Sequence, residues 1–124
     1  MDCFICRKFN NGDFLLENDL AFALWDGFPV TKGHALICPK RHEADYFELT
    51  EDEILAIHDL IHRFSEDLSE ADASVTGFNI GINCGKSAGQ TVFHCHVHLI
   101  PRRDGDVENP KGGVRGVIPG KMGY

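Results

Sequence analysis

The sequence lacks an apolar run long enough to span a bilayer, and it does not start with the segments of a signal peptide. We therefore expect a cytoplasmic protein without a membrane partner. Basic residues are also scarce, with 12 Lys and Arg against 19 Asp and Glu, for a formal net charge of −7. A nucleic-acid partner is not expected, because such a face must neutralise phosphates, although a local positive pocket can still bind a small anionic substrate.

The length and composition fit one globular domain spanning residues 1–124. Hydrophobic residues make up 43% and charged residues 25% of the 124 residues, and a chain of this size buries roughly two-thirds of its unfolded surface. The cysteines are odd in number, which in a cytosolic chain disfavours disulfides and favours metal binding or burial. They are Cys3, Cys6, Cys38, Cys84 and Cys95.

The hydrophobic pattern predicts one long helix and four strands. Thr50 and Glu53 form a capping box, and apolar residues then recur at intervals of three and four, which predicts a helix over 51–70. Alternating apolar residues predict strands over 20–26, 34–38, 78–84 and 91–101. After a core of residues 1–102, the tail over 103–124 is rich in glycine and proline, which indicates an irregular C-terminal arm. The order of strands, helix and strands predicts an α+β domain with a mainly antiparallel sheet.

The last predicted strand contains FHCHVHLI, in which His94, His96 and His98 occupy every second position. On a strand the three imidazoles share a face, and the outer Cα atoms are about 13 Å apart. A zinc ion binds imidazole nitrogens at about 2.1 Å, so two neighbours can converge on one metal but hardly three. The row as a whole is therefore not one metal site.

Three other roles are open to this row. A pH switch needs a second conformation, for which the sequence offers no element, and a merely polar sheet face seldom needs three histidines. We favour nucleophilic catalysis, because a neutral imidazole nitrogen attacks phosphorus when its other nitrogen is held as a donor. The polar loop over residues 85–91 and the neighbouring imidazoles can stabilise phosphate oxygens and protonate a leaving group.

The motif HCHVHLI, with AGQTVFHCHVHLIPR, VTKGHALICPKRH and FALWDGFP, resembles the histidine triad (HIT) family. The resemblance covers most of the chain from Cys3 to Arg102 and is strongest to the microbial branch, similar to diadenosine polyphosphate hydrolases and nucleoside phosphoramidases. It implies a HIT-like fold with a mainly antiparallel five-stranded sheet and one long helix. It also implies a homodimer whose protomers join their sheets.

The resemblance implies a role for each catalytic histidine. His96 would be the nucleophile that takes the nucleotidyl group, and His98 would contact the scissile phosphate and assist departure of the leaving group. His34, after the Lys-Gly turn, would support them from the neighbouring strand. The implied reaction transfers a nucleoside monophosphate from a phosphoanhydride or phosphoramidate to His96 and then to water. The alternative is a nucleotide-binding or zinc-stabilised interaction protein in which hydrolysis is incidental.

The resemblance also implies a set of residues that bind the small-molecule nucleotide substrate. Asn83, Gln90 and Thr91 match positions that hydrogen-bond phosphate oxygens, and Asp26 matches the acidic residue that accepts the ribose hydroxyls. Without the resemblance, Asp26 could simply close a turn and Asn83 could cap a strand end. The base would be held by apolar residues around Phe4, Phe22 and Leu24.

Cys3 and Cys6 form a C-x-x-C motif, whose spacing suits two thiolates on one tetrahedral zinc but is also compatible with redox chemistry or burial. The resemblance implies that two histidines join this cysteine pair as ligands, and the matching residues here are His42 and His94. All four ligands would then come from the protein, so the zinc would be structural and would hold the N-terminus against the catalytic strand. No catalytic metal is strictly required, because no carboxylate cluster is present to hold one.

The remaining histidines and the basic residues of the tail allow simpler interpretations. His58 and His62 lie one helical turn apart but lack the glutamate of an HExxH motif, which favours exposed helix histidines. Arg102, Arg103 and Arg115 would contact either a distal phosphate of the substrate or only a partner chain. The identity of the substrate and of its leaving group therefore stays open.

Overall fold

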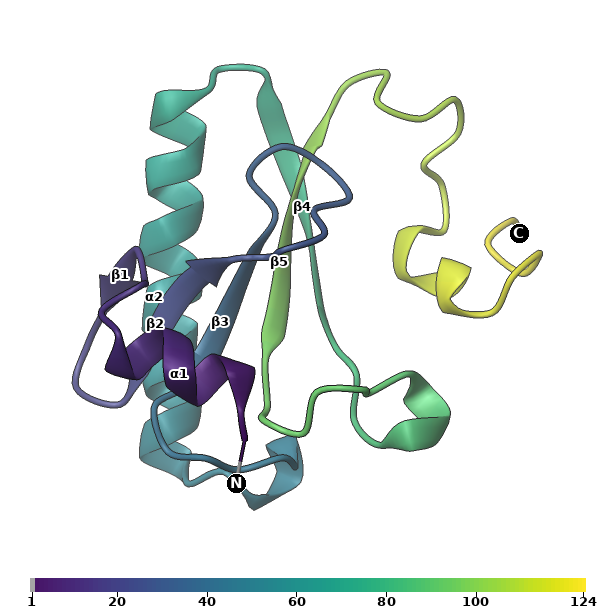
Figure 1. Cartoon of the computed structure of the whole chain (residues 1–124). Helices are drawn as coiled ribbons and strands as arrows, with labels where there is room; N and C mark the ends of the chain where they lie inside the picture. The colour runs from purple at the N-terminus through teal and green to yellow at the C-terminus, as the bar shows by residue number, and fades with distance from the viewer. Residues whose placement is uncertain (1) are drawn as a thin grey trace.

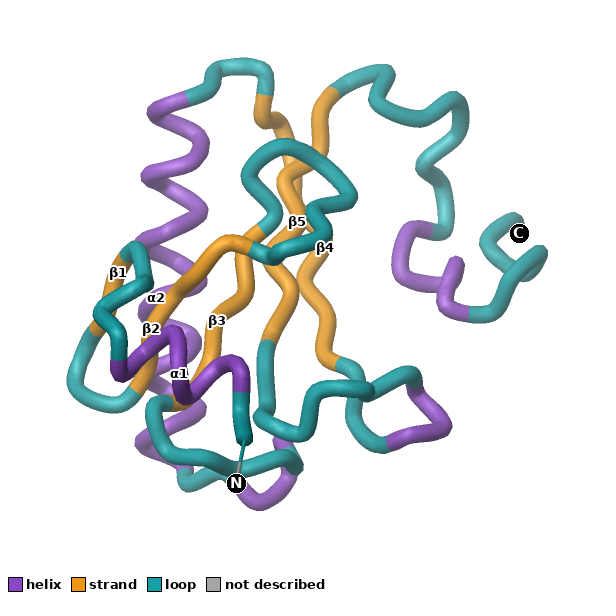
Figure 2. Tube along the Cα trace, in the orientation of Figure 1, coloured by secondary structure: helices purple, strands orange, loops and turns teal. Residues whose placement is uncertain are grey.

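The computed structural model describes residues 2–124, which form a five-stranded antiparallel sheet and two α-helices (Figures 1 and 2). In chain order these are α1 (Phe4–Asn10), β1 (Leu16–Glu17), β2 (Ala21–Trp25), β3 (Ala35–Pro39), α2 (Glu51–Ala71), β4 (Val75–Ile82) and β5 (Val97–Arg103). The strand order is β1-β2-β3-β5-β4, and each neighbouring pair is antiparallel. The predicted α+β class and five-stranded sheet are confirmed.

Different elements cover the two faces of the sheet. On one face Ala23 of β2 packs with Leu60 of α2 in the main core. On the other face Phe22, the adjacent residue, packs with Ile5 of α1, as the alternation of side chains along a strand requires. The C-terminal arm lies beyond β4, at the opposite edge of the sheet from β1 (Figure 1). The middle of the α1 face, over β3 and β5, therefore lies between α1 and the arm.

Helix α2 begins at the predicted capping box. The backbone N–H of Glu53 donates to Thr50 Oγ1 at 3.1 Å, and the Glu53 carboxylate accepts from the Thr50 backbone N–H at 2.9 Å. The helix runs over Glu51–Ala71, one residue beyond the predicted 51–70. Within residues 2–124, no helix has both the length and the apolar character of a membrane span.

Strand β5 begins later than the predicted strand over 91–101, and this part of the prediction was wrong. Its pairing with β3 starts at Val97, opposite Ile37, although β3 itself continues to Pro39 along β2. The backbone N–H of Cys95 donates instead to the Glu43 carbonyl at 2.7 Å. The first two histidines of the motif therefore precede the strand, so their side chains need not lie on the same face of the sheet as the side chain of His98.

Helix α1 was not predicted. It has seven residues, too few for a clear period, and its N-terminus is capped by the Cys3 Sγ, which accepts from the Cys6 backbone N–H at 3.4 Å. The C-x-x-C motif thus occupies the first turn of a helix, where a spacing of three brings both thiols to one side.

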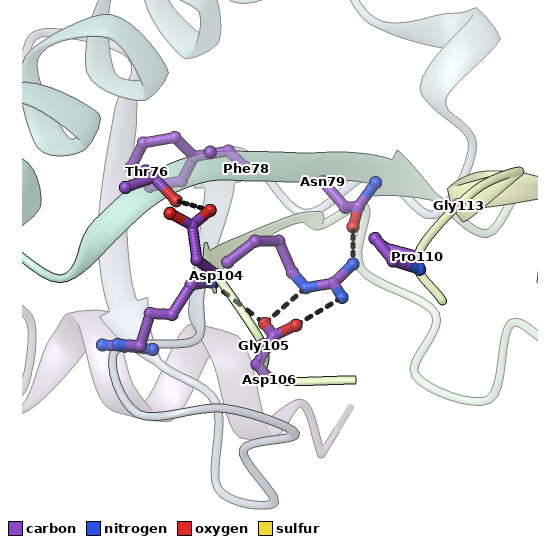
Figure 3. A pocket seen from close by; sticks show the side chains of 11 residues that line it. Thr76, Phe78, Asn79, Asp104, Gly105, Asp106, Pro110 and Gly113 are labelled. Carbon is purple, nitrogen blue, oxygen red and sulfur yellow. Dashed lines mark hydrogen bonds and ion pairs between the residues drawn. The ribbon is translucent and has the colours of Figure 1, made fainter. Parts of the chain in front are cut away.

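The C-terminal arm is tied to the sheet by Arg102 of β5. Its guanidinium donates to both carboxylate oxygens of Asp106 at 2.8 Å and to Asn79 Oδ1 of β4 at 2.7 Å. Figure 3 shows these interactions around the pocket where the arm leaves the sheet. Farther along, the 3-10 turn Gly113–Val117 contacts β4. The arm is therefore ordered against the edge of the sheet.

Candidate active site and metal centre

His34 and His98 form a hydrogen-bonded pair in the middle of the sheet. His98 lies opposite Leu36 in the β3–β5 ladder, and its Nδ1 is 2.9 Å from Nε2 of the buried His34. The backbone N–H of Val30 donates to His34 Nδ1 at 3.1 Å, so this nitrogen has no proton. In the neutral pair His34 therefore donates from Nε2 to His98 Nδ1, and His98 carries its proton on Nε2.

His96 is oriented by the backbone of its own motif. Its Nδ1 is 2.8 Å from the carbonyl oxygen of His94, which can only accept. The proton of neutral His96 is thus on Nδ1, and Nε2 has a free lone pair. The rings of His96 and His98 are neighbours, with centroids 5.3 Å apart. An imidazole with an unprotonated Nε2 therefore lies beside one that carries its proton on Nε2.

Asp26 joins the histidines at the end of β2. One carboxylate oxygen, Oδ1, accepts from the Phe28 backbone N–H at 2.7 Å and so closes the turn. The other, Oδ2, is 3.3 Å from His34 Nε2 and 3.7 Å from His98 Nδ1. Asp26 therefore closes a turn, as considered from the sequence, and lies beside the histidine pair, while its contact with the ribose hydroxyls stays a prediction.

Burial keeps the His34–His98 pair neutral near pH 7. Burial lowers the pKa of His34 below its usual 6.5, and the negative charge of Asp26 only partly opposes this. The pKa of His98 is also lowered, first by burial and then by the neighbouring His96 and His34 imidazoles. The neutral forms preserve the directed hydrogen bonds described above.

The three residues that were predicted to bind phosphate oxygens lie in different surroundings at the loop between β4 and β5. Buried Gln90 accepts from the Gly85 N–H at 2.9 Å and donates to the carbonyls of Ala44 and Val92, which uses both of its amide hydrogens. Its phosphate contact stays a prediction, while its observed role is to shape the loop. Asn83 lines a cavity together with His98, whereas exposed Thr91 lines a different cavity.

The structure brings the four predicted zinc ligands together. The Nδ1 atom of His94 is 3.4 Å from Cys3 Sγ and 3.5 Å from Cys6 Sγ, and Cys6 Sγ is 3.6 Å from His42 Nδ1. All four ligand atoms lie within 4.8 Å of one another. In a tetrahedral site with Zn–S of about 2.3 Å and Zn–N of about 2.05 Å, sulfur and nitrogen are about 3.5 Å apart. The cluster therefore has the donors and the spacing of a zinc site.

His94 is prepared for this role by its second nitrogen. Its Nε2 lies 2.7 Å from the Pro39 carbonyl oxygen and donates to it, which leaves Nδ1 unprotonated and directed at the cysteines. The imidazole is fully buried. A ligating histidine held in this way is oriented before metal binds.

Comparison with known proteins agrees with this geometry. The sequence model of the HIT domain matches residues 7–105. The chain belongs to the HIT family. A crystal structure of a Zn-bound histidine triad family protein from Mycobacterium smegmatis superposes on this HIT protein with a TM-score of 0.78 and 34% identity. The alignment covers 88% of this chain and 81% of that one.

Two curated relatives have named activities. A bis(5'-adenosyl)-triphosphatase of Dictyostelium discoideum is 38% identical over 97 residues, which are 78% of this chain and 64% of that protein. The adenylylsulfatase HINT3 of Arabidopsis thaliana is 34% identical over 109 residues, or 85% of this chain and 54% of that protein. The chain thus spans less than two thirds of either enzyme. The named activities of these two relatives support nucleotide hydrolysis in general.

Sequence reasoning missed several groups that complete the site. The N–H of Val30 and the carbonyl of Pro39 set the protonation of two histidines, but backbone groups leave no mark in a sequence. The tail arginines have contacts within the chain, and their predicted contacts with a distal phosphate or a partner chain stay predictions. Arg102 is bound to Asp106 and Asn79, and Arg103 donates to Asp72 at 2.9 Å. The guanidinium of Arg115 lies 5.0 Å from the Tyr124 ring.

Proposed function

We propose that this HIT protein is a nucleotide hydrolase that forms a covalent nucleotidyl–His96 intermediate. The observation that carries the proposal is the 2.8 Å hydrogen bond from His96 Nδ1 to the His94 carbonyl. It leaves Nε2 unprotonated and fixes the ring, as a histidine nucleophile requires. The named activities of the two relatives, on a dinucleoside triphosphate and an adenylyl sulfate, support the same class of reaction.

The other residues have defined tasks in this proposal. His98, with its proton on Nε2, donates to the bridging atom as the leaving group departs. His34 holds that tautomer by donating to His98 Nδ1. Asn83 and Thr91 hydrogen-bond phosphate oxygens, and Gln90 holds the loop beside them. Asp26 accepts from the ribose hydroxyls through the oxygen that faces the histidine pair.

The substrates of this proposal are nucleotides joined through phosphorus to a second group. Dinucleoside polyphosphates such as diadenosine tetraphosphate are the first class, and adenosine phosphoramidate is the alternative. Both provide an electrophilic phosphorus, a nucleoside with a ribose diol, and a leaving group that accepts a proton. A nucleotide-binding protein in which hydrolysis is incidental is the competing function outside enzymes.

Zinc has a structural role in this proposal. Cys3, Cys6, His42 and His94 would fill a tetrahedral shell, and with no open position the ion would hold α1 beside the catalytic motif. Two zinc-bound thiolates require reduced cysteines, which favours the cytoplasm. A homodimer is part of the proposal as well, in which the second copy would meet both the half-exposed Ile80 of the edge strand β4 and the C-terminal arm that lies beyond this strand.

The function is tested by replacing the nucleophile. His96→Ala is expected to abolish turnover of diadenosine tetraphosphate, diadenosine triphosphate and adenosine phosphoramidate, and to retain binding of nucleoside monophosphate in calorimetry. The matched control is His62→Ala, which removes an exposed histidine of α2 and should keep wild-type turnover. Hydrolysis that survives in His96→Ala overturns the nucleophile. Binding without turnover in the wild type would instead support the competing function.

A further inference from the structure

The metal-ligand cluster of Cys3, Cys6, His42 and His94 lies beside a cavity at the surface. The cavity has a volume of about 380 Å³, and Cys3, His42 and exposed Thr91 are among the residues that line it. Cys6 is only partly buried, whereas His94 is fully buried. A small molecule can therefore reach the sulfur atoms of the cluster from solvent.

The two thiols of the cluster are placed to form a disulfide. Cys3 is the N-cap of α1 and Cys6 is its third residue, and their Sγ atoms lie within 4.8 Å of each other. Helix geometry separates Cα atoms three residues apart by about 5 Å, which is inside the range of roughly 4.4–6.8 Å for disulfides. The backbone therefore needs no rearrangement. Cys38, Cys84 and Cys95 lie outside the cluster.

His94 connects the cluster to the proposed nucleophile. Its Nδ1 lies 3.4 Å from Cys3 Sγ and 3.5 Å from Cys6 Sγ, while its backbone carbonyl accepts from His96 Nδ1 at 2.8 Å. Because His94 Nε2 donates to the Pro39 carbonyl, Nδ1 can only accept a hydrogen bond or bind a metal ion.

A disulfide removes the partners of this nitrogen. It has no S–H to donate and no thiolate to bind a metal ion. The buried Nδ1 of His94 then lacks its two sulfur partners, which is unfavourable for a buried polar atom. The position of His94, and with it the hydrogen bond that fixes His96, therefore depends on reduced cysteines.

We infer that Cys3 and Cys6 are an oxidation site, and that their disulfide releases the metal ion and lowers the activity of His96. The inference rests on the proposed function and adds a form of regulation to it. The oxidant is hydrogen peroxide, which is small and uncharged and so enters the cavity beside the cluster. A dithiol reductant restores the pair by thiol–disulfide exchange.

The oxidation balances with one hydrogen peroxide. The thiolate of Cys6, the less buried of the two, attacks one peroxide oxygen, which breaks the O–O bond, forms a sulfenic acid and releases hydroxide. The Cys3 thiolate then attacks the sulfenic sulfur and displaces a second hydroxide. Two electrons pass from the sulfur atoms to the peroxide, and two solvent protons convert the hydroxides to water. His42 and His94 alone remain as ligands, too few to retain a structural zinc ion.

Mass spectrometry of the oxidised wild type identifies the site. Trypsin cleaves after Arg7 and yields the peptide MDCFICR, which contains Cys3, Cys6 and no other cysteine. A small excess of hydrogen peroxide should lower the mass of this peptide by two hydrogen atoms. A zinc-sensitive dye should record about one zinc ion released per chain. Dithiothreitol should reverse the mass change, which separates a disulfide from irreversible oxidation.

Turnover of the nucleotide that the wild type cleaves best tests the connection to His96. Oxidation should lower kcat at least about tenfold, because a displaced His94 misplaces the nucleophile, and dithiothreitol should restore it. Cys6→Asp keeps a ligand atom for zinc but cannot form the disulfide, so its zinc content and its turnover should resist peroxide. Cys84→Ser is the matched control, because it removes a partly buried cysteine outside the cluster and should respond as the wild type does.

The outcomes separate this inference from the proposed function. If peroxide leaves the peptide MDCFICR reduced, the oxidation site is wrong and the nucleotide hydrolase stands; this measurement needs no variant to fold. If the disulfide forms and zinc leaves but turnover is unchanged, the connection through His94 is wrong. Equal loss of turnover in Cys6→Asp and the wild type also overturns the inference. If the reduced wild type cleaves none of the three substrates, the proposed function fails and the regulation of His96 with it, while the peptide mass still decides the oxidation site.

Discussion

Glu53 is a buried carboxylate at the first turn of α2, and its replacement by glutamine is expected to destabilise the fold in a pH-dependent way. The residue is 4% exposed, and its carboxylate accepts from Arg41 at 2.8 and 3.0 Å and from the Thr50 N–H at 2.9 Å. The hydrogen bonds from Arg41 are the main cause that lowers the pKa of Glu53 from 4.5 to about 2. Glu53→Gln keeps the shape and removes the charge.

The expected loss of folding free energy follows from the difference between the pKa of Glu53 in the folded state and in the unfolded state. A difference of 4.5 − 2 = 2.5 pKa units corresponds to about 3.4 kcal/mol at 1.36 kcal/mol per unit. The Arg41 side chain is 48% exposed, so solvent screens the pair and we expect roughly 2 kcal/mol. Because the pKa is lower in the folded state, this stability is fully present above pH 4.5 and is lost as the pH falls toward 2. At pH 3 less than half of it should remain.

Urea unfolding of wild type and Glu53→Gln at pH 7 and pH 3 measures this difference. The free energy of unfolding of the variant should be lower by roughly 2 kcal/mol at pH 7, and the two proteins should approach each other at pH 3. Glu51→Gln, an exposed carboxylate in the same first turn, is the matched control and should cost only about 0.3–1 kcal/mol. An equal loss for Glu53→Gln at both pH values would refute the charge-based account and leave only a packing effect.

Two further predictions concern the histidine pair and the metal centre. His34→Ala removes the donor that holds the His98 tautomer and should lower kcat by about a hundredfold; His34→Gln, which keeps an amide N–H donor, should recover part of it. No recovery in steady-state assays would contradict the hydrogen-bond role. Cys3→Ser should abolish the zinc found by elemental analysis, with Cys84→Ser, a cysteine outside the cluster, as control. Unchanged zinc in Cys3→Ser would disprove the proposed ligand set.

Local signals in the sequence determined the elements that depend on neighbouring residues. The capping box at Thr50 and the period of three and four predicted α2 to within one residue, because both act within one or two helical turns. Alternation located β2 and β3 to within one residue at each end for the same reason, whereas the strand predicted over 78–84 begins three residues earlier and ends two residues earlier, as β4 (Val75–Ile82). The spacing of the C-x-x-C motif and the resemblance to the HIT family together predicted the four-residue metal cluster that the structure assembles.

Tertiary structure decided what depends on partners far along the chain. Strand β5 starts only at Val97, and just before it the Cys95 N–H donates to the distant Glu43 carbonyl, a contact that no pattern within residues 91–101 contains. The tautomer of His34 is set by the backbone N–H of Val30, and the role of Arg102 by Asp106 and Asn79. Hydrogen bonds of this kind join backbone and side-chain groups whose proximity exists only after folding. In FHCHVHLI, His94 thus belongs to the buried metal-ligand cluster, His96 has an unprotonated Nε2, and His98 carries its proton on Nε2. This difference between the three histidines is a property of the fold.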